Sequence, residues 1–316
     1  MTRQSKDQTR PSVRNKRLFY LVIAVVIILV PIVYFYSVSL TEPSPPKAAI
    51  IDQLGSSKLA ENVRFENRTF VEAAQELLHL RYSIIDYYSD NATVEQYKEL
   101  ASRGYKLIVW RAHSALDLKS KYVAISTTDK YSSDNYGQYL DNDQLTLCNI
   151  TGDSDLRKMY LGITPKFVKE VMNGRFDDTT IILMSCNGLR YGYYATAQAF
   201  EEKGVRVFIS WDEWVDFENN DRATSLLLQY LLSENDTVSV ATSRIPAYAS
   251  GSGATVRLRY DPENAADYQI PCYKQNGDTC ASMSGALVIL EKAKKHSALT
   301  LEMNRARRTC QPLHSS

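Results

Sequence analysis

The feature that most constrains this 316-residue chain is an uncharged apolar run near its N-terminus. Residues 18–36 read LFYLVIAVVIILVPIVYFY, which is 19 residues without a charged side chain. A helix rises about 1.5 Å per residue, so this length roughly crosses a hydrocarbon layer of about 30 Å. Pro31 interrupts the run, but a spanning helix tolerates proline better than a soluble helix does. The run therefore predicts one transmembrane helix, with aromatic residues at both ends in the headgroup region.

The segment before this run is basic. Residues 1–17 contain six Lys or Arg residues and one acidic residue, Asp7. By the positive-inside rule, the N-terminus lies in the cytoplasm and everything after the run lies outside it, as in a single-pass protein of the cell membrane. A cleaved signal peptide is the alternative, but its apolar core is usually shorter and ends at small residues. The bulky aromatic end of this run favours an uncleaved signal-anchor.

Composition then divides the rest of the chain. Residues 37–47 form a linker that contains three prolines between Thr41 and Pro46, which favour a short stiff spacer. Residues 48–262 are expected to form an extracytoplasmic domain, and residues 263–316 a C-terminal extension. The chain carries +1 overall and +5 in residues 1–17, which leaves about −4 outside. The expected partners are therefore the lipid bilayer and a polypeptide substrate or protein partner, and not nucleic acid.

Sequons and cysteines agree with an outside location. Four N-x-Ser/Thr sequons could accept glycans there. They begin at Asn67, Asn91, Asn149 and Asn235. Cys272 and Cys280 lie eight residues apart in a polar, glycine-containing stretch and are the best disulfide candidate, with Cys148 and Cys310 as a weaker pair. Cys186 remains, in surroundings of a different kind.

Strand-length apolar runs alternate with amphipathic helical stretches in the outer domain. Strands are predicted over residues 48–52, 83–87, 106–112, 180–185 and 205–211. Helices are predicted to begin at the Thr69–Glu72 capping box, at Thr93 and at Thr164, and to cover residues 194–203, 221–233 and a short stretch after Asp236. Residues 122–126 and 144–148 are predicted to flank a long, tyrosine-rich hairpin excursion.

This alternation predicts an α/β fold with a mostly parallel, doubly wound sheet and helices on both of its faces. Sites in such sheets form at the carboxyl ends of the strands. The chain contains no Walker loop, no G-x-G-x-x-G motif and no zinc-type spacing of Cys and His, so no cofactor and no metal are predicted.

Two side chains lie where this rule points. His113 directly follows the strand LIVWRA, and Cys186 directly follows the strand IILMS. Neighbouring parallel strands would let the imidazole approach the thiol, and a nearby imidazole raises the fraction of thiolate, which is the nucleophile. Asn187 and Gly188 allow a tight turn that points the N–H of Cys186 at a developing oxyanion.

This order of elements resembles the caspase-like clan of cysteine peptidases, which includes caspases, gingipains, clostripain, separase and CHAT domains. Residues 185–188 (SCNG) are similar to the small-Cys-x-Gly segment around the caspase nucleophile. Residues 197–216 are similar to the CHAT and gingipain segment after the cysteine, in which a helix, a glycine and a strand end in tryptophan and an acidic residue. The resemblance covers roughly residues 106–232 and implies a caspase-like fold.

The resemblance also implies roles for individual residues. His113 would be the general base and acid, Cys186 the nucleophile, and the backbone N–H groups of Ser114 and Cys186 the oxyanion hole. Three acidic residues after the fifth strand would lie near the specificity pocket and favour a basic residue before the scissile bond, with Trp211 as packing or pocket wall. They are Asp212, Glu213 and Asp216. The clan usually has glycine after the histidine, so Ser114 is a departure that affects turnover more than fold.

Two functions of different classes follow. The first is a membrane-anchored extracytoplasmic cysteine peptidase with a His/Cys dyad. The alternative is a catalytically inactive caspase-like binding or scaffolding protein at the cell surface, in which Cys186 is a buried inert thiol and His113 a structural histidine. A third class, a metal-dependent glycan-modifying enzyme, depends on Asp141 and Asp143 alone, without nucleotide-sugar fold signals around them.

Overall fold

The computed structural model describes Ile23 and residues 25–30, 45–132, 134–249 and 253–272. It divides the chain into two compact units, Met1–Ser44 and Pro45–Ser316, and we describe each by itself. In the first unit the described residues are helical and their apolar side chains are exposed. Among the described residues, no helix is long and apolar enough to cross a membrane. The rest of the predicted 18–36 helix, the basic segment before it and residues 37–44 of the linker lie outside the described residues.

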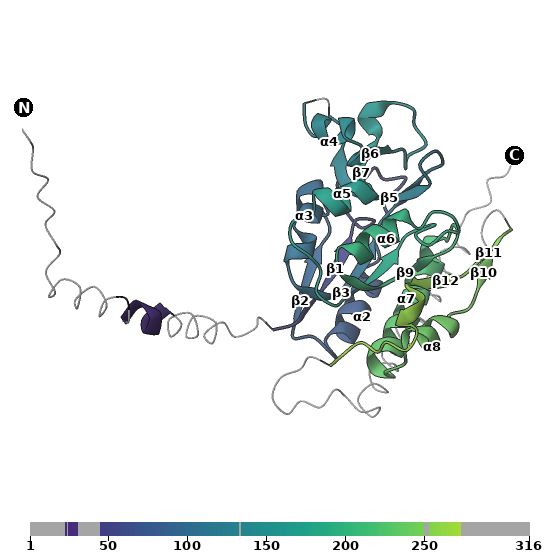
Figure 1. Cartoon of the computed structure of the whole chain (residues 1–316). Coiled ribbons are helices and arrows are strands. Elements are labelled where there is room, and N and C mark those ends of the chain that lie inside the picture. The colour runs from purple at the N-terminus through teal and green to yellow at the C-terminus, as the bar shows by residue number, and fades with distance from the viewer. Residues whose placement is uncertain (1–22, 24, 31–44, 133, 250–252, 273–316) are drawn as a thin grey trace, which may run out of the picture. The chain divides into compact units, whose positions relative to one another are not determined.

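The second unit is built on a six-stranded sheet in the order β12-β9-β8-β3-β1-β2 (Figure 1). Its strands are β1 (Lys47–Asp52), β2 (Ile84–Tyr88), β3 (Tyr105–Arg111), β8 (Thr179–Met184), β9 (Val205–Trp211) and β12 (Leu258–Asp261). The neighbouring strands β2, β1, β3, β8 and β9 pair in parallel, and in this sheet only β12 runs antiparallel to its neighbour β9. The predicted α/β class with a mostly parallel sheet is confirmed. Strands β3 and β8, the two most apolar runs, are neighbours inside the sheet, where both faces are buried.

Helices cover both faces of this sheet. One face is covered by α2 (Arg68–Leu78), α7 (Phe217–Leu228) with its π-helical continuation Gln229–Ser233, and α8 (Val238–Ser243). The other face is covered by α3 (Val94–Lys98), α5 (Pro165–Glu170) and α6 (Ala195–Glu202). Successive residues of a strand point to opposite faces, so Leu107 and Val109 join the first core, and Ile108 and Trp110 the second.

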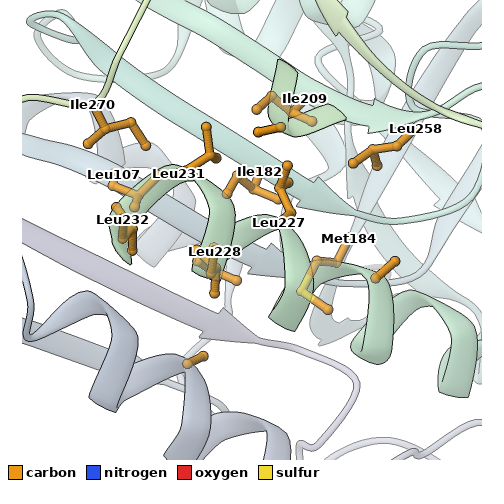
Figure 2. Close-up of a cluster of buried hydrophobic side chains, with 14 of the residues drawn as sticks. Leu107, Ile182, Met184, Ile209, Leu227, Leu228, Leu231, Leu232, Leu258 and Ile270 are labelled. Atoms are coloured by element: carbon orange, nitrogen blue, oxygen red, sulfur yellow. The ribbon is translucent and has the colours of Figure 1, made fainter. Parts of the chain in front are cut away.

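The core beneath α7 shows how the helix is held on the sheet (Figure 2). Leucines at 227, 228, 231 and 232 recur with helical spacing and face strand residues such as Ile182 and Ile209. All of these side chains are buried. Since burying one such side chain contributes about 1.5–3 kcal/mol, this cluster fixes α7, and with it the start of the helix, against the sheet.

A second, four-stranded antiparallel sheet is inserted between β3 and β8. Its order is β4-β5-β7-β6, with β4 (Ser114–Asp117), β5 (Tyr122–Lys130), β6 (Leu145–Cys148) and β7 (Tyr160–Ile163). The short helix α4 (Gly137–Asp141) lies between β5 and β6 in the chain. The predicted hairpin between residues 122–126 and 144–148 is wrong, because β7 lies between these two strands and pairs with both.

Two helix starts also differ from the prediction. Helix α2 begins at Arg68 and not at the Thr69 capping box, because Asn67 Oδ1 accepts the hydrogen bond from Phe70 N. Helix α7 begins at Phe217, four residues before the predicted start, because Asp216 caps it by accepting from Asn219 N. In both cases a side-chain oxygen that satisfies a first-turn N–H group sets the helix start, ahead of the apolar pattern.

The end of the described chain packs on the same core. Strands β10 (Tyr248–Ala249) and β11 (Thr255–Val256) form a two-stranded sheet, and a 3₁₀ turn covers Glu263–Ala265. Ile270 is buried in the core beneath α7, so residues after 262 still belong to this packing. Cys272 is disulfide-bonded, and its predicted partner Cys280 lies outside the described residues. Cys148 is a buried free thiol, so the weaker predicted pair with Cys310 is wrong.

Candidate functional site

The topology brings the ends of β3 and β8 together. Arg111 and Met184 are register partners in these parallel strands, and each lies two residues before a predicted site residue. Beyond the paired region, Ser114 Oγ donates a hydrogen bond of 2.6 Å to the carbonyl oxygen of Cys186. The loops that carry His113 and Cys186 are therefore in direct contact at the carboxyl edge of the sheet.

The imidazole of His113 is held by a backbone carbonyl. Its Nε2 lies 2.7 Å from Val63 O, and since a carbonyl can only accept, Nε2 carries the proton. In the neutral ring, Nδ1 is then the atom with a free lone pair. The ring also meets Phe217 edge-on, with centroids 5.5 Å apart. Burial lowers the pKa of His113, the Val63 bond works against this, and nearby Arg111 adds to the lowering, so the ring is neutral at pH 7.

The backbone of His113 is held by a residue that the sequence analysis missed. Gln53 is fully buried directly after β1, and its Oε1 accepts from His113 N at 3.0 Å. Gln53 N also donates to Arg111 O at 2.8 Å, and its Nε2 donates to Thr127 O at 3.1 Å. The only sequence signal for Gln53 is its position after a predicted strand.

Cys186 does not contact His113 through a hydrogen bond within the described part of the chain. Its Sγ instead donates to Val215 O at 3.4 Å, and the side chain packs against the core beneath α7. Burial raises the pKa of the Cys186 thiol, the hydrogen bond to Val215 opposes this, and the carboxylates of Glu213 and Asp216 raise it further. In this conformation the thiol is protonated at neutral pH.

The turn after the cysteine is tight, as Asn187-Gly188 predicts. Asn187 has a left-handed φ of 61°, and its N–H donates to Glu213 O at 3.1 Å. A Cβ on Gly188 would lie 2.1 Å from Ser210 Oγ, so only glycine lets this turn approach β9 so closely. The turn fixes where the backbone of Cys186 points relative to β9.

The N–H of Ser114, one of the two predicted oxyanion donors, is not used in the hydrogen bonds between β4 and β5. Ser126 N donates to His113 O at 3.0 Å, which makes Ser114 and Ile125 a non-hydrogen-bonded pair of β4 and β5. The N–H of Ser114 therefore points away from β5. Because the Ser114 hydroxyl bonds to Cys186 O, this N–H lies on the loop that borders the cysteine.

The four predicted pocket residues have different environments. Trp211 is fully buried, and its Nε1 donates to Asn220 Oδ1 at 2.8 Å. Asp216 is the N-cap of α7. Asp212 accepts from Arg257 N at 2.7 Å and from Arg259 Nε at 3.0 Å. Trp211, Asp212 and Asp216 therefore all take part in structural hydrogen bonds, and the side chain of Asp212 is 20% exposed.

Asp212 and Glu213 line a pocket of about 390 Å³ together with Arg190, Tyr191 and Thr255. Arg190 Nη1 bonds Glu213 Oε1 at 2.8 Å and Asn187 Oδ1 at 3.0 Å. Asn187 follows Cys186, so the pocket borders the cysteine turn, although neither His113 nor Cys186 lines it. Its acidic groups are already paired with arginine side chains.

The sequons differ in accessibility. Asn67 Nδ2, the atom that a glycan would use, donates to Asp221 Oδ2 at 2.8 Å in a partly buried position. Asn91, Asn149 and Asn235 are exposed. A glycan at Asn67 would replace one of the two Nδ2 hydrogens in this partly buried position beside Asp221, whereas the side chains of the other three sites are exposed.

Within the described ranges, no group of three or more His, Cys, Asp or Glu side chains could hold a metal ion. Asp141 and Asp143 are exposed at the end of α4. No protein-family model matches the chain, and a search of curated proteins finds no relative.

Proposed function

We propose that the chain is a membrane-anchored, extracytoplasmic cysteine peptidase of the caspase-like clan, with His113 and Cys186 as its dyad. One observation carries this proposal: the two residues follow neighbouring parallel strands, and the loops that hold them are joined by the Ser114–Cys186 hydrogen bond. The Val63 carbonyl fixes the imidazole tautomer that a general base needs. The uncharged run at 18–36 and the basic residues before it support the anchor.

In the proposed reaction, His113 Nδ1 accepts the proton of the Cys186 thiol, and the thiolate attacks the carbonyl carbon of a peptide bond. The N–H groups of Ser114 and Cys186 stabilise the oxyanion of the tetrahedral intermediate. The imidazolium then protonates the leaving amine, which gives a thioester on Cys186. Water, deprotonated by the neutral imidazole, hydrolyses the thioester and restores the thiol.

This reaction requires one local change. The Cys186 thiol must leave the Val215 carbonyl and rotate towards His113 Nδ1, because its Sγ is hydrogen-bonded to Val215 O and not to the imidazole. Approach of the imidazole removes part of the burial penalty on the thiolate, since an adjacent base or cation favours the charged form.

The pocket beside the cysteine turn supports a preference for a basic substrate residue. Asp212 and Glu213 both line it, and the side chain of Glu213 is 25% exposed. A substrate arginine or lysine would compete with Arg190 for Glu213, so the preference comes from exchange of one ion pair for another.

A binding or scaffolding protein is the second candidate. The raised pKa of Cys186 favours it, because burial keeps the thiol protonated, and the hydrogen bond of Sγ to Val215 O leaves the thiol without contact to the imidazole. The serine at position 114, where the clan usually has glycine, also favours the binding protein. In that case the carboxyl edge of the sheet would serve as a docking surface.

The rate of Cys186 alkylation separates these two functions. We expect a peptidyl electrophile with arginine next to the reactive group to label the full-length chain at pH 7.5, with loss of labelling in Cys186→Ala. His113→Ala is expected to slow labelling by about 10²- to 10⁴-fold, because the thiol then lacks its base. Mass spectrometry of the intact chain measures the rate.

Cys148 provides the matched control. It is a second free thiol, fully buried, and burial raises its pKa to about 12. Cys148→Ser is expected to leave the labelling rate unchanged. Labelling of wild type that is slow and indifferent to His113 would refute the peptidase and leave the binding protein.

A further inference from the structure

Arg111 is the last residue of β3, two residues before His113, and its side chain is completely buried. Its Nε donates to Asp221 Oδ1 at 2.7 Å and its Nη2 to Asp221 Oδ2 at 2.9 Å, so this pair is bidentate. Its Nη1 donates to Asp52 Oδ1 at 2.7 Å. We call these three residues the Arg111 cluster. A buried arginine between two carboxylates is costly to desolvate, and the protein keeps it at the edge of the sheet that carries His113.

The guanidinium also reaches the chain segment that holds the imidazole. Arg111 Nη1 donates to Phe65 O at 2.8 Å, and the guanidinium lies over the Phe65 ring at 5.1 Å from its centroid. Phe65 is two residues after Val63, whose carbonyl accepts from His113 Nε2. Arg111 therefore fixes the same short segment that fixes His113.

The start of α7 closes this network from the other side. The Phe217 ring stacks on Phe65 with centroids 5.0 Å apart and meets His113 edge-on. Asp221 lies one turn further along α7 and holds Arg111. One helix thus contacts both the imidazole and the guanidinium, and the Phe65 ring lies against both Phe217 and Arg111.

We propose that Arg111 is a positioning residue for His113. Arg111 holds the carbonyl and the ring of Phe65, and in this way it keeps the Val63 carbonyl oxygen in its hydrogen bond with His113 Nε2. This bond maintains the tautomer in which Nδ1 is free to accept a proton. This inference rests on the proposed function in that it assigns the imidazole the role of base. It adds a residue outside the dyad, which acts through the segment 63–65.

A purely structural Arg111 makes a different prediction. It would stabilise the domain, and its loss would lower stability without changing which ring nitrogen of His113 carries the proton. The tautomer is therefore the readout that separates positioning from general stabilisation.

The test uses the full-length chain with ¹⁵N-labelled histidine, which contains four histidines. Comparison with His113→Gln assigns the His113 signals, and ¹⁵N shifts report the tautomer and the pH titration of the ring. Arg111→Lys keeps the positive charge but removes the planar fork that reaches Asp221 and Phe65 together. We expect wild type to show the Nε2–H tautomer and Arg111→Lys to show a mixture of both.

Arg81→Lys is the matched control. Arg81 is also buried, and it donates to Leu232 O at 2.8 Å and Asn235 Oδ1 at 2.9 Å, so its replacement perturbs a buried arginine outside the network. We expect it to leave the His113 spectrum unchanged. Phe65→Leu is the second variant if Arg111→Lys does not fold: it removes the ring between Arg111 and Phe217 and is expected to mix the tautomers to a smaller extent.

Alkylation of Cys186 gives the second readout. In Arg111→Lys, the rate at saturating electrophile is expected to fall about 10- to 100-fold with an unchanged half-saturating concentration, because a displaced base affects the chemical step. A single Nε2–H tautomer in both Arg111→Lys and Phe65→Leu would overturn the inference even if wild type reacts fast. A tautomer that depends on Arg111 in a chain that does not react would instead refute the peptidase and keep the positioning role.

Discussion

Two polar clusters join neighbouring strands of the large sheet, and they are built from different chemistry. The Arg111 cluster joins the carboxyl ends of β1 and β3 through full charges with almost no exposure: the side chains of Arg111 and Asp221 are 0% and 6% exposed. The second cluster, which we call the Tyr105 cluster, joins β2 to the start of β3. There Tyr105 OH donates to Asp86 Oδ2 at 2.5 Å and meets Tyr88 OH at 2.6 Å.

The two clusters differ in the partners that remain for a carboxylate when one side chain of the cluster is removed. The Asp86 carboxylate is 34% exposed and has Lys47 at 3.6 Å, so water and a second cation remain if a phenol is removed. Asp52 and Asp221 have no comparable access to water. An ionic cluster without access to water is sensitive to the loss of any of its members, and this one lies beside His113, the proposed general base. The Tyr105 cluster is expected to lose less stability when one of its side chains is removed.

The largest expected effect is the removal of the guanidinium. Arg111→Met leaves Asp52 and Asp221 buried without a cation, and breaking a buried pair in this way costs about 3–5 kcal/mol. We expect the free energy of unfolding in urea to fall by that amount at pH 7. The loss is expected to shrink as the pH is lowered, because burial raises the pKa of Asp221 and its unpaired carboxyl can then bind a proton.

Arg81→Met sharpens this comparison. Arg81 bonds two neutral oxygen atoms, Leu232 O and Asn235 Oδ1, so its removal strands no buried charge. The expected loss is about 1–3 kcal/mol and independent of pH below 7. Equal losses in the two variants, with equal pH dependence, would show that the charges of the Arg111 cluster carry no special weight.

The Tyr105 cluster is expected to give a smaller effect. Burial and the neighbouring Asp86 raise the pKa of Tyr105 far above its ordinary value, so its hydroxyl stays a donor throughout the stable range. Tyr105→Phe removes one hydrogen bond to a charged acceptor and is expected to cost about 1–2 kcal/mol of unfolding free energy. Urea unfolding measures it, and a loss as large as that of Arg111→Met would contradict the proposed tolerance of this cluster.

The sequence could predict the large sheet and the position of the proposed site residues in it. Residues 106–112 and 180–185 are nearly continuous apolar runs, which is typical of strands buried on both faces, and the structure has β3 and β8 there. One rule, that sites form at the carboxyl ends of parallel strands, then points to His113 and Cys186. The order of the strands was not needed for that step.

Other parts had no signal that a single sequence could supply. Strand β7 has only four residues, YLGI, and its position between β5 and β6 depends on long-range pairing. The group that orients His113 is the backbone carbonyl of Val63, and a backbone atom leaves no trace in residue type. Asp221 is 110 residues from Arg111, so their pairing depends on where α7 packs.

The smallest effect is the pH dependence that His113 itself contributes. Its pKa in the folded chain lies below 6.5, so as the pH falls through 6.5 the unfolded chain binds the proton first. The free energy of unfolding is therefore expected to decrease below pH 6.5, by at most about 1.4 kcal/mol per pH unit, and His113 adds no slope above it. Burial raises the pKa of Glu201 to about 7, which gives a slope of opposite sign, so the measured quantity is the difference between wild type and His113→Gln. A difference that is flat from pH 7 to pH 5 would show that the imidazole is not held in its partly buried contact with Val63 and Phe217. The Arg111 cluster would then lie beside a histidine that it does not help to hold.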